Sequence, residues 1–172
     1  LAAWSGHAEG ADFVLVNPMH AASPASPMEA SPYLPVTRRF ANPLYLRVEA
    51  IEEYAGLSLD DRAKIETLSI PVRALSTSAD LIDRDVIWAA KSQALAIVFD
   101  APLTPGRQAL FDAFVTREGQ GLVDFATWCA LVEAHGADSR AWPAALQDPG
   151  TDAVAAERER LADRVRWHSW LQ

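Results

Sequence analysis

The sequence contains a single cysteine, Cys129, few basic residues and no long run of apolar residues. One cysteine permits no internal disulfide, which fits the reducing cytoplasm. The 15 lysines and arginines against 23 acidic residues give a net charge of −8, so the chain lacks the basic footprint that a nucleic-acid-binding protein needs. No apolar stretch approaches the roughly 18 residues of a membrane-spanning helix. We therefore expect a cytoplasmic protein that binds neither nucleic acid nor membrane.

The composition is that of a globular protein, with 50% hydrophobic and 22% charged residues, which excludes disorder of the chain as a whole. The chain begins at Leu1 without a methionine and ends in an apolar stretch. Its last helix, expected from about Thr151 to the end, is apolar on two faces, one carrying Val154 and the other Trp167. A helix that is apolar on both sides must be buried on both sides. We expect a piece of a longer protein.

Residues 12–16 (DFVLV) form a short, continuous apolar run rich in branched side chains. The run is bounded by Gly10 and Pro18, and such a pattern is typical of a strand that is buried on both faces. We predict a strand here, of the kind found in parallel sheets and barrels rather than in one-sided hairpins.

Residues 17–43 hold six of the eleven prolines. Because proline fixes φ and removes a backbone donor, neither a helix nor an internal strand can cross this stretch. A long loop in a compact domain is usually either functional or disordered. The interleaved aromatic residues, among them Tyr33 and Phe40, favour a functional loop.

Helices are expected after this loop. Residues 58–61 resemble a capping box, with Asp61 in place of the usual Glu or Gln, and begin a short helix that ends near Leu68 because Pro71 follows. Further helices are expected to start at Asp83, at Thr104 followed by proline, after Gly119 and near Thr151, with Gly136 as a stop. The one that follows Thr104 is expected to bury Leu110, Phe111, Phe114 and Val115.

No cluster of metal ligands stands out in the sequence. The four histidines are scattered: His7, His20, His135 and His168. The zinc motifs His-Glu-x-x-His and Cys-x-x-Cys are missing, so we expect no metal site. We interpret His168 as a packing residue of the last helix. Cys129 and His135 are six residues apart, so on a helix His135 falls about 240° round the wheel from Cys129, and the two do not predict a catalytic pair.

Two other patterns have simpler explanations than a cofactor site. Asp80, Asp83 and Asp85 lack the spacing of a calcium loop, and acidic residues at the start of a helix account for them. Residues 119–124 imitate a dinucleotide fingerprint at two glycines only and follow a helix rather than a strand. We therefore expect no cofactor.

Tyr33 is the residue of the proline-rich loop that most invites a functional interpretation. The loop leaves the end of the predicted strand, and ligands bind at that end in α/β sheets and barrels. An aromatic ring held there by the neighbouring Pro32 can lie against the apolar face of a sugar. The other interpretation is that Tyr33 packs the loop onto the body of the protein, and the residues alone leave both open.

Several motifs in this region resemble the amylomaltase (4-alpha-glucanotransferase) family of the alpha-amylase superfamily, and most of all its actinobacterial type. They are residues 11–21 (ADFVLVNPMHA), Ser31-Pro32-Tyr33-Leu34-Pro35, Arg38-Arg39-Phe40 and Asn42-Pro43-Leu44-Tyr45-Leu46. The likeness continues, less specifically, through 128–135 and 165–170. Thr37 stands where the family would place a serine.

The resemblance implies part of an α/β (β/α)8 TIM barrel. The piece itself is expected to be mainly α, with one or two short parallel strands and the long proline-rich loop. The implied reaction moves alpha-1,4-glucan segments between maltodextrins by a retaining double displacement, without a cofactor. Maltodextrins and other alpha-1,4-glucans are the implied partners.

The resemblance also implies which residues face the substrate. None of the acidic residues matches the family's nucleophile, acid/base or third carboxylate, so no catalytic residue is assigned in this chain. Tyr33 matches the tyrosine that contacts the sugar, and His20 is a second candidate for lining the site. Arg38, Arg39 and Asn42 are expected to hold the loop in place.

We predict three parts of the chain. Residues 1–56 are an early barrel strand with its substrate loop, residues 57–150 a helical insertion, and residues 151–172 a helix that leads to the next barrel strand. The alternative hypothesis is a stand-alone helical module that binds carbohydrate or another partner without catalysis.

Overall fold

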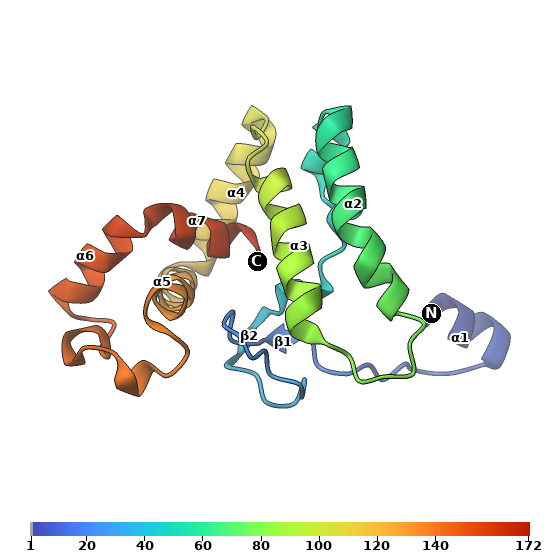
Figure 1. Cartoon of the computed structure of the whole chain (residues 1–172), viewed down its shortest axis with the longest axis horizontal. Helices are drawn as coiled ribbons and strands as arrows, with labels where there is room; N and C mark the ends of the chain where they lie inside the picture. The colour runs from blue at the N-terminus through green and yellow to red at the C-terminus, as the bar shows by residue number, and fades with distance from the viewer. Residues whose placement is uncertain (1) are drawn as a thin grey trace.

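The computed structural model describes residues 2–172, which fold into a mainly helical structure with one small sheet (Figure 1). The sheet pairs β1 (His20–Ala21) with β2 (Thr37–Ala41). The helices, in chain order, are α1 (Ala2–Glu9), α2 (Leu59–Leu75), α3 (Arg84–Phe99), α4 (Pro105–Glu118), α5 (Gln120–His135), α6 (Asp152–Arg160) and α7 (Ala162–Trp170). Short 3-10 helices occupy the connections: η1 (Pro43–Tyr45), η2 (Val48–Ala50), η3 (Glu52–Gly56), η4 (Ser139–Ala141) and η5 (Ala144–Leu146).

The predicted helix starts are confirmed by their caps. The side chains of Ser58, Asp83 and Thr104 each accept a hydrogen bond from a backbone N–H in the first turn of α2, α3 and α4. These N–H groups have no partner within their own helix, so the side-chain oxygen stabilises the helix end. Gly119, at φ 61°, separates α4 from α5, and Gly136, at φ 94°, follows α5 as predicted.

The predicted end of α2 near residue 68 is wrong, because the helix continues to Leu75 with Pro71 inside it. Proline removes the bond that the carbonyl of Thr67 would otherwise accept. Both residues are exposed, so water can satisfy that carbonyl at little cost.

The final helical segment is divided at Leu161, whose φ of −101° and ψ of 22° end α6 and begin α7. Its two apolar faces are both covered, as the sequence predicts. Val154 of α6 packs into one buried cluster, while Trp167 and Leu171 pack into another.

The helix α4 buries less than its sequence predicts. None of its residues is buried, and the side chain of Leu110 is 62% exposed. Phe114 and Val115 are partly buried and pack against Phe40 and Leu122. The apolar stripe of α4 therefore covers the sheet only along part of its length.

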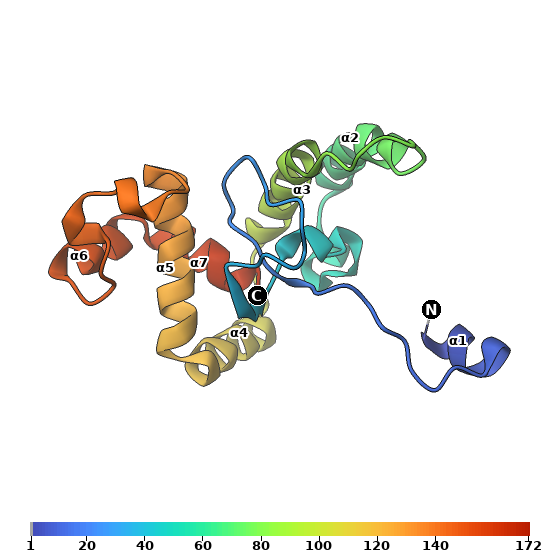
Figure 2. The same ribbon diagram turned by 90° about the horizontal axis from the view of Figure 1, so that it is seen from below.

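The prediction of parallel strands is wrong, since β1 and β2 run antiparallel with His20 opposite Ala41 and Ala21 opposite Thr37. The predicted strand at residues 12–16 is also wrong. Phe13 is 81% exposed, and the segment runs extended between α1 and the body of the protein (Figure 2). A continuous apolar run needs neighbouring strands to bury it, and no strand within residues 2–172 pairs with this one.

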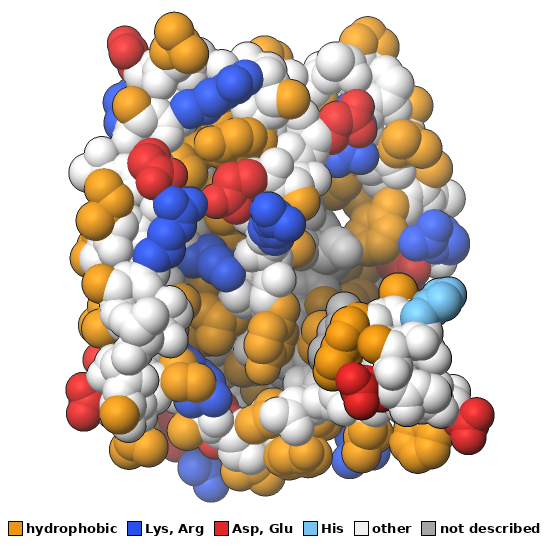
Figure 3. All heavy atoms as spheres, turned by 90° about the vertical axis from the view of Figure 1, so that its right-hand side faces the viewer, with side chains coloured by type: hydrophobic (Ala, Val, Ile, Leu, Met, Phe, Trp, Pro, Cys, Tyr) orange, Lys and Arg blue, Asp and Glu red, His pale blue; other side chains and the backbone are white. Residues whose placement is uncertain are grey.

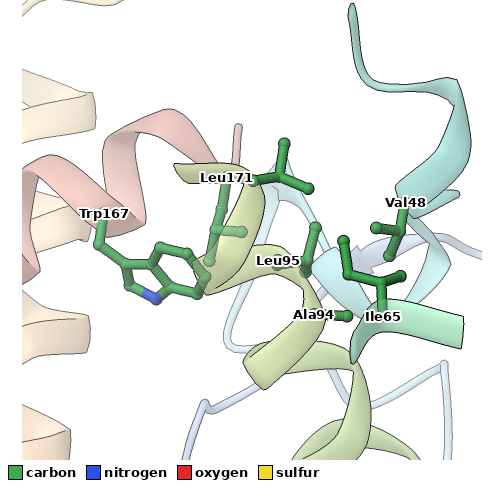
Figure 4. Close-up of a cluster of buried hydrophobic side chains, with 7 residues drawn as sticks. Val48, Ile65, Ala94, Leu95, Trp167 and Leu171 are labelled. Atoms are coloured by element: carbon green, nitrogen blue, oxygen red, sulfur yellow. The ribbon is translucent and has the colours of Figure 1, made fainter. Parts of the chain in front are cut away.

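The largest core cluster lies where α3 meets α2 and α7 (Figure 4). Leu95 of α3 is fully buried between Ile65 of α2 and Leu171 at the end of α7. Trp167 closes the cluster from the α7 side, with its ring 5.3 Å from that of Phe99 in an edge-on arrangement. Burial of such side chains supplies about 1.5–3 kcal/mol each.

Many hydrophobic side chains remain at the surface, where Figure 3 shows them among charged groups on the side of the molecule that carries α1. Leu81 at 97% exposure, in the connection before α3, and Leu59 at 82%, in α2, are examples. None of the helices described in residues 2–172 has the length and apolar character required to cross a membrane.

The Glu133 carboxylate joins α5 to α7. Arg164 donates two hydrogen bonds of 2.7 Å to its two oxygens, and Nε2 of the buried His168 lies 3.1 Å from Oε1. Partial burial raises the pKa of Glu133, but the contacts with His168 and Arg164 outweigh it and lower the pKa from 4.5 to about 2. His168 is therefore a buried packing residue, as predicted, with a carboxylate beside it.

The lowered pKa of Glu133 makes folding sensitive to acid. The stabilisation is complete above pH 4.5 and disappears as the pH falls towards 2, because the unfolded chain binds the proton first. The pKa shift corresponds to at most about 3 kcal/mol of unfolding free energy, and solvent screening reduces this contribution to about 1–2 kcal/mol. Glu133→Gln should therefore flatten the unfolding free energy between pH 5 and 2, relative to the exposed control Glu159→Gln, in urea titrations. Identical acid profiles for both variants would contradict it.

Candidate functional site

The proline-rich loop leaves and re-enters the body of the protein at the small sheet. The N–H of Val36 donates to the carbonyl of Ala21 at 2.9 Å, and the N–H of Asn42 donates to the carbonyl of Met19 at 2.9 Å. Ala21 is completely buried. The sheet therefore fixes both ends of the loop, and residues 22–36 project from it.

The middle of the loop is held by Asp85 in the first turn of α3. Its Oδ1 accepts hydrogen bonds from the hydroxyl of Ser26 at 2.7 Å and from the N–H of Met28 at 3.0 Å. Met28 is 9% exposed. The two acidic residues at this helix start have different roles. Asp83 caps α3, as predicted, and Asp85 holds the loop through Met28, which lies 57 residues away in the sequence. Sequence reasoning missed this anchor because local spacing carries no signal of it.

Tyr33 stands on the outside of the anchored loop. The residue is 65% exposed, and its hydroxyl donates to Oδ1 of Asn17 at 3.0 Å. Its N–H donates to the hydroxyl of Ser31 at 3.3 Å, and the N–H of Leu34 donates to the Ser31 carbonyl at 3.3 Å. The ring is therefore oriented by polar contacts and presents its surface to solvent rather than packing into one of the buried clusters.

His20 lies in β1 and is partly buried. It lines a small hollow together with Pro32 of the loop, Asn42 and Tyr45 after β2, and Arg84 at the start of α3. Tyr33 is not among the residues that line this hollow. Within the described chain the two candidates thus share the loop and its base but do not converge on one cavity.

The three residues expected to hold the loop differ in what they do. Asn42 caps η1 by accepting the N–H of Leu44 at 2.9 Å. Arg39 donates to the carbonyl of Glu118 at 2.7 Å, which ties β2 to the end of α4. Both have structural roles, as expected. Arg38 is exposed and its side chain makes no hydrogen bond or ion pair with residues 2–172, so its expected role is not observed.

Cys129 and His135 do not form a catalytic pair. Cys129 is 3% exposed, and burial raises the pKa of its thiol far above the ordinary value, which keeps it protonated. His135 instead contacts Glu157 of α6, with Nε2 3.2 Å from Oε2. The cysteine is a core residue, as its position in the apolar stripe predicts.

Comparison with known proteins extends the motif resemblance to the whole chain. The family model of the 4-alpha-glucanotransferases matches residues 1–172. The chain belongs to the 4-alpha-glucanotransferase family. It is 49% identical over 178 residues to the 4-alpha-glucanotransferase of Mycobacterium tuberculosis, and the match covers 100% of the chain and 24% of that protein.

More distant and structural relatives agree. The 4-alpha-glucanotransferase of Haemophilus influenzae is 29% identical over 180 residues, which cover 95% of the chain and 26% of that protein. The crystal structure of amylomaltase from Corynebacterium glutamicum superposes with a TM-score of 0.72 at 43% identity, covering 94% of the chain and 21% of the amylomaltase. The chain thus spans about a quarter of the length of the curated relatives it matches. The hypothesis of a stand-alone helical module is not favoured.

Proposed function

We propose that the whole protein transfers alpha-1,4-glucan segments from one maltodextrin to the 4-hydroxyl of another. The observation that carries this proposal is the family match along residues 1–172. The exposed, hydrogen-bonded Tyr33 supports it, since an oriented aromatic ring with a free face suits the apolar face of a glucose unit. The single buried cysteine is compatible with a reaction in the cytoplasm.

In this proposal the chain contributes substrate binding rather than bond cleavage. Residues 1–56 carry the substrate loop, residues 57–150 form a helical insertion, and residues 151–172 lead to the next strand of a (β/α)8 barrel. The carboxylates of a retaining double displacement lie outside this chain. Tyr33 positions a glucose unit beside them, His20 lines the base of the loop, and neither residue exchanges a proton with the reacting sugar.

Incubation of the whole protein with maltotriose alone tests the proposal. We expect glucose and maltodextrins longer than maltotriose, with no cofactor added, because the released segment is passed to the 4-hydroxyl of a second sugar. Chromatography of the products over time measures this. Unchanged maltotriose would refute the proposal, and glucose with maltose but no longer product would indicate a hydrolase.

A further inference from the structure

A groove beside the Tyr33 loop lies between α5 and the segment from η4 to α6, on the side of the molecule opposite α1 (Figures 1 and 2). It has a volume of about 540 Å³, within the roughly 300–1,000 Å³ of small-molecule sites. Phe125, Trp128 and Leu131 of α5 line one side, and Leu146 and Val154 line the other. The groove thus has apolar walls on both sides.

Several polar groups that line this groove have hydrogen-bonding capacity left over. Thr127 is 3% exposed, and its hydroxyl has no hydrogen-bond partner in residues 2–172. Arg158 of α6 is partly buried, and its side chain makes no ion pair or hydrogen bond with the described residues. A buried hydroxyl without a partner carries a desolvation cost of about 1–3 kcal/mol, which a polar ligand would remove.

Two further side chains that line the groove, Gln147 and Asp124, are oriented by hydrogen bonds that leave one oxygen of each unused. The Nε2 of Gln147 donates hydrogen bonds to the carbonyls of Trp142 at 2.8 Å and Arg140 at 3.2 Å. Asp124 accepts from Gln120 through Oδ1 at 2.7 Å. The Oε1 of Gln147 and the Oδ2 of Asp124 accept no hydrogen bond from residues 2–172, so the groove, which Arg158 also lines, presents oriented acceptors as well as donors.

An aromatic row ends at the groove. The rings of Phe40 and Phe125 stack with centroids 4.6 Å apart, and Phe125 and Trp128 follow at 6.4 Å with planes inclined by 21°. Trp128, the last ring of this row, is partly buried and lines the groove. Its indole therefore contributes apolar surface to the wall of the groove.

We propose that this groove binds a stretch of an alpha-1,4-glucan remote from the reacting bond. A glucose unit has an apolar face that suits the Trp128 indole and a rim of hydroxyls that suits Arg158, Thr127 and the oriented acceptors. The identification of the ligand as a glucan rests on the proposed function. Val36, a residue of the Tyr33 loop, also lines the groove, so the groove adjoins the loop that is proposed to bind the sugar.

The proposal predicts that only long substrates depend on the groove. In the whole protein, Arg158→Gln and Trp128→Ala should raise KM for long maltodextrins about 10-fold, since each removes a polar or stacking contact. Turnover of maltotriose should change less than 2-fold, because a trisaccharide is bound at the loop. Glu159→Gln, an exposed neighbour on α6 without a side-chain hydrogen bond or ion pair in residues 2–172, is the matched control.

Affinity electrophoresis in an amylose gel provides a readout that does not need activity. Wild type and Glu159→Gln should be retarded by amylose, and Arg158→Gln should be retarded less. Should Trp128→Ala fail to fold, Arg158→Gln with Trp128→Phe carries the test. Equal effects on short and long substrates, or unchanged retardation of both groove variants, would overturn the proposed groove. Failure of the wild type to rearrange maltotriose would overturn the proposed function instead, while amylose retardation still decides the groove.

Discussion

Replacing Tyr33 by alanine in the whole protein is expected to lower kcat/KM for maltotriose by about 10–100-fold. Burying an aromatic side chain of this size against a ligand is worth roughly 1.5–3 kcal/mol, which corresponds to that factor. Because the ring is 65% exposed, its removal should leave the unfolding free energy within about 0.5 kcal/mol of wild type. Initial rates with maltotriose and a urea titration of each variant measure the two quantities.

Three further variants separate the contact of the ring from its orientation. Tyr33→Phe keeps the ring and loses the bond to Asn17, so a loss of only about 5-fold is expected. Asn17→Ala should give a similar loss, and the double variant should be no worse than either single one. Leu34→Ala, at a neighbouring side chain that is 64% exposed, is the matched control. Wild-type activity of Tyr33→Ala would show that this residue does not contact the substrate.

Replacing Arg107 by methionine is expected to destabilise the protein by about 3 kcal/mol at pH 7. The Glu53 carboxylate in η3 is 4% exposed and is held by two bonds from Arg107 at the start of α4, at 2.6 and 3.3 Å. Breaking such a pair leaves a buried charge without a partner, which costs about 3–5 kcal/mol, and the partial exposure of Arg107 puts the effect at the lower end. Urea unfolding measures it.

The Glu53–Arg107 pair also predicts how the destabilisation caused by Arg107→Met depends on pH. The hydrogen bonds from Arg107 lower the pKa of Glu53 below 4.5, so the pair stabilises the protein above that pH and loses its effect as the pH falls. The difference between wild type and Arg107→Met should therefore shrink below pH 4.5. Arg73→Met, which breaks exposed pairs with Glu49 and Glu66, should cost under about 1 kcal/mol. Equal losses for both variants would contradict the assigned role of the Glu53 pair.

Local sequence chemistry predicted the helices well and the strands poorly. The caps at Ser58, Asp83 and Thr104 act within one helical turn, so the residues that form them are visible in the sequence. A strand depends on a partner that is distant along the chain. Residues 12–16 have the composition of a buried strand, yet they lie exposed because no strand within residues 2–172 pairs with them.

The candidate site shows the same division between local and distant contacts. The proline spacing and the motif around Tyr33 predicted an unusual loop with a presented aromatic ring. The contacts that hold it could not be predicted, since Asp85 reaches Met28 and Asn17 reaches Tyr33 only after folding. The side-chain amide of Gln172 likewise accepts a hydrogen bond from the N–H of Ala41 and donates one to its carbonyl. These two bonds link residue 172 to β2.

The most direct test of glucan transfer is a count of reducing ends during the reaction with maltotriose. Transfer to a sugar hydroxyl forms one glycosidic bond for each bond that is broken, whereas transfer to water does not. We expect the concentration of reducing ends to stay constant while glucose accumulates and longer maltodextrins appear. A rise in reducing ends in step with the released glucose would contradict a transferase and identify a hydrolase.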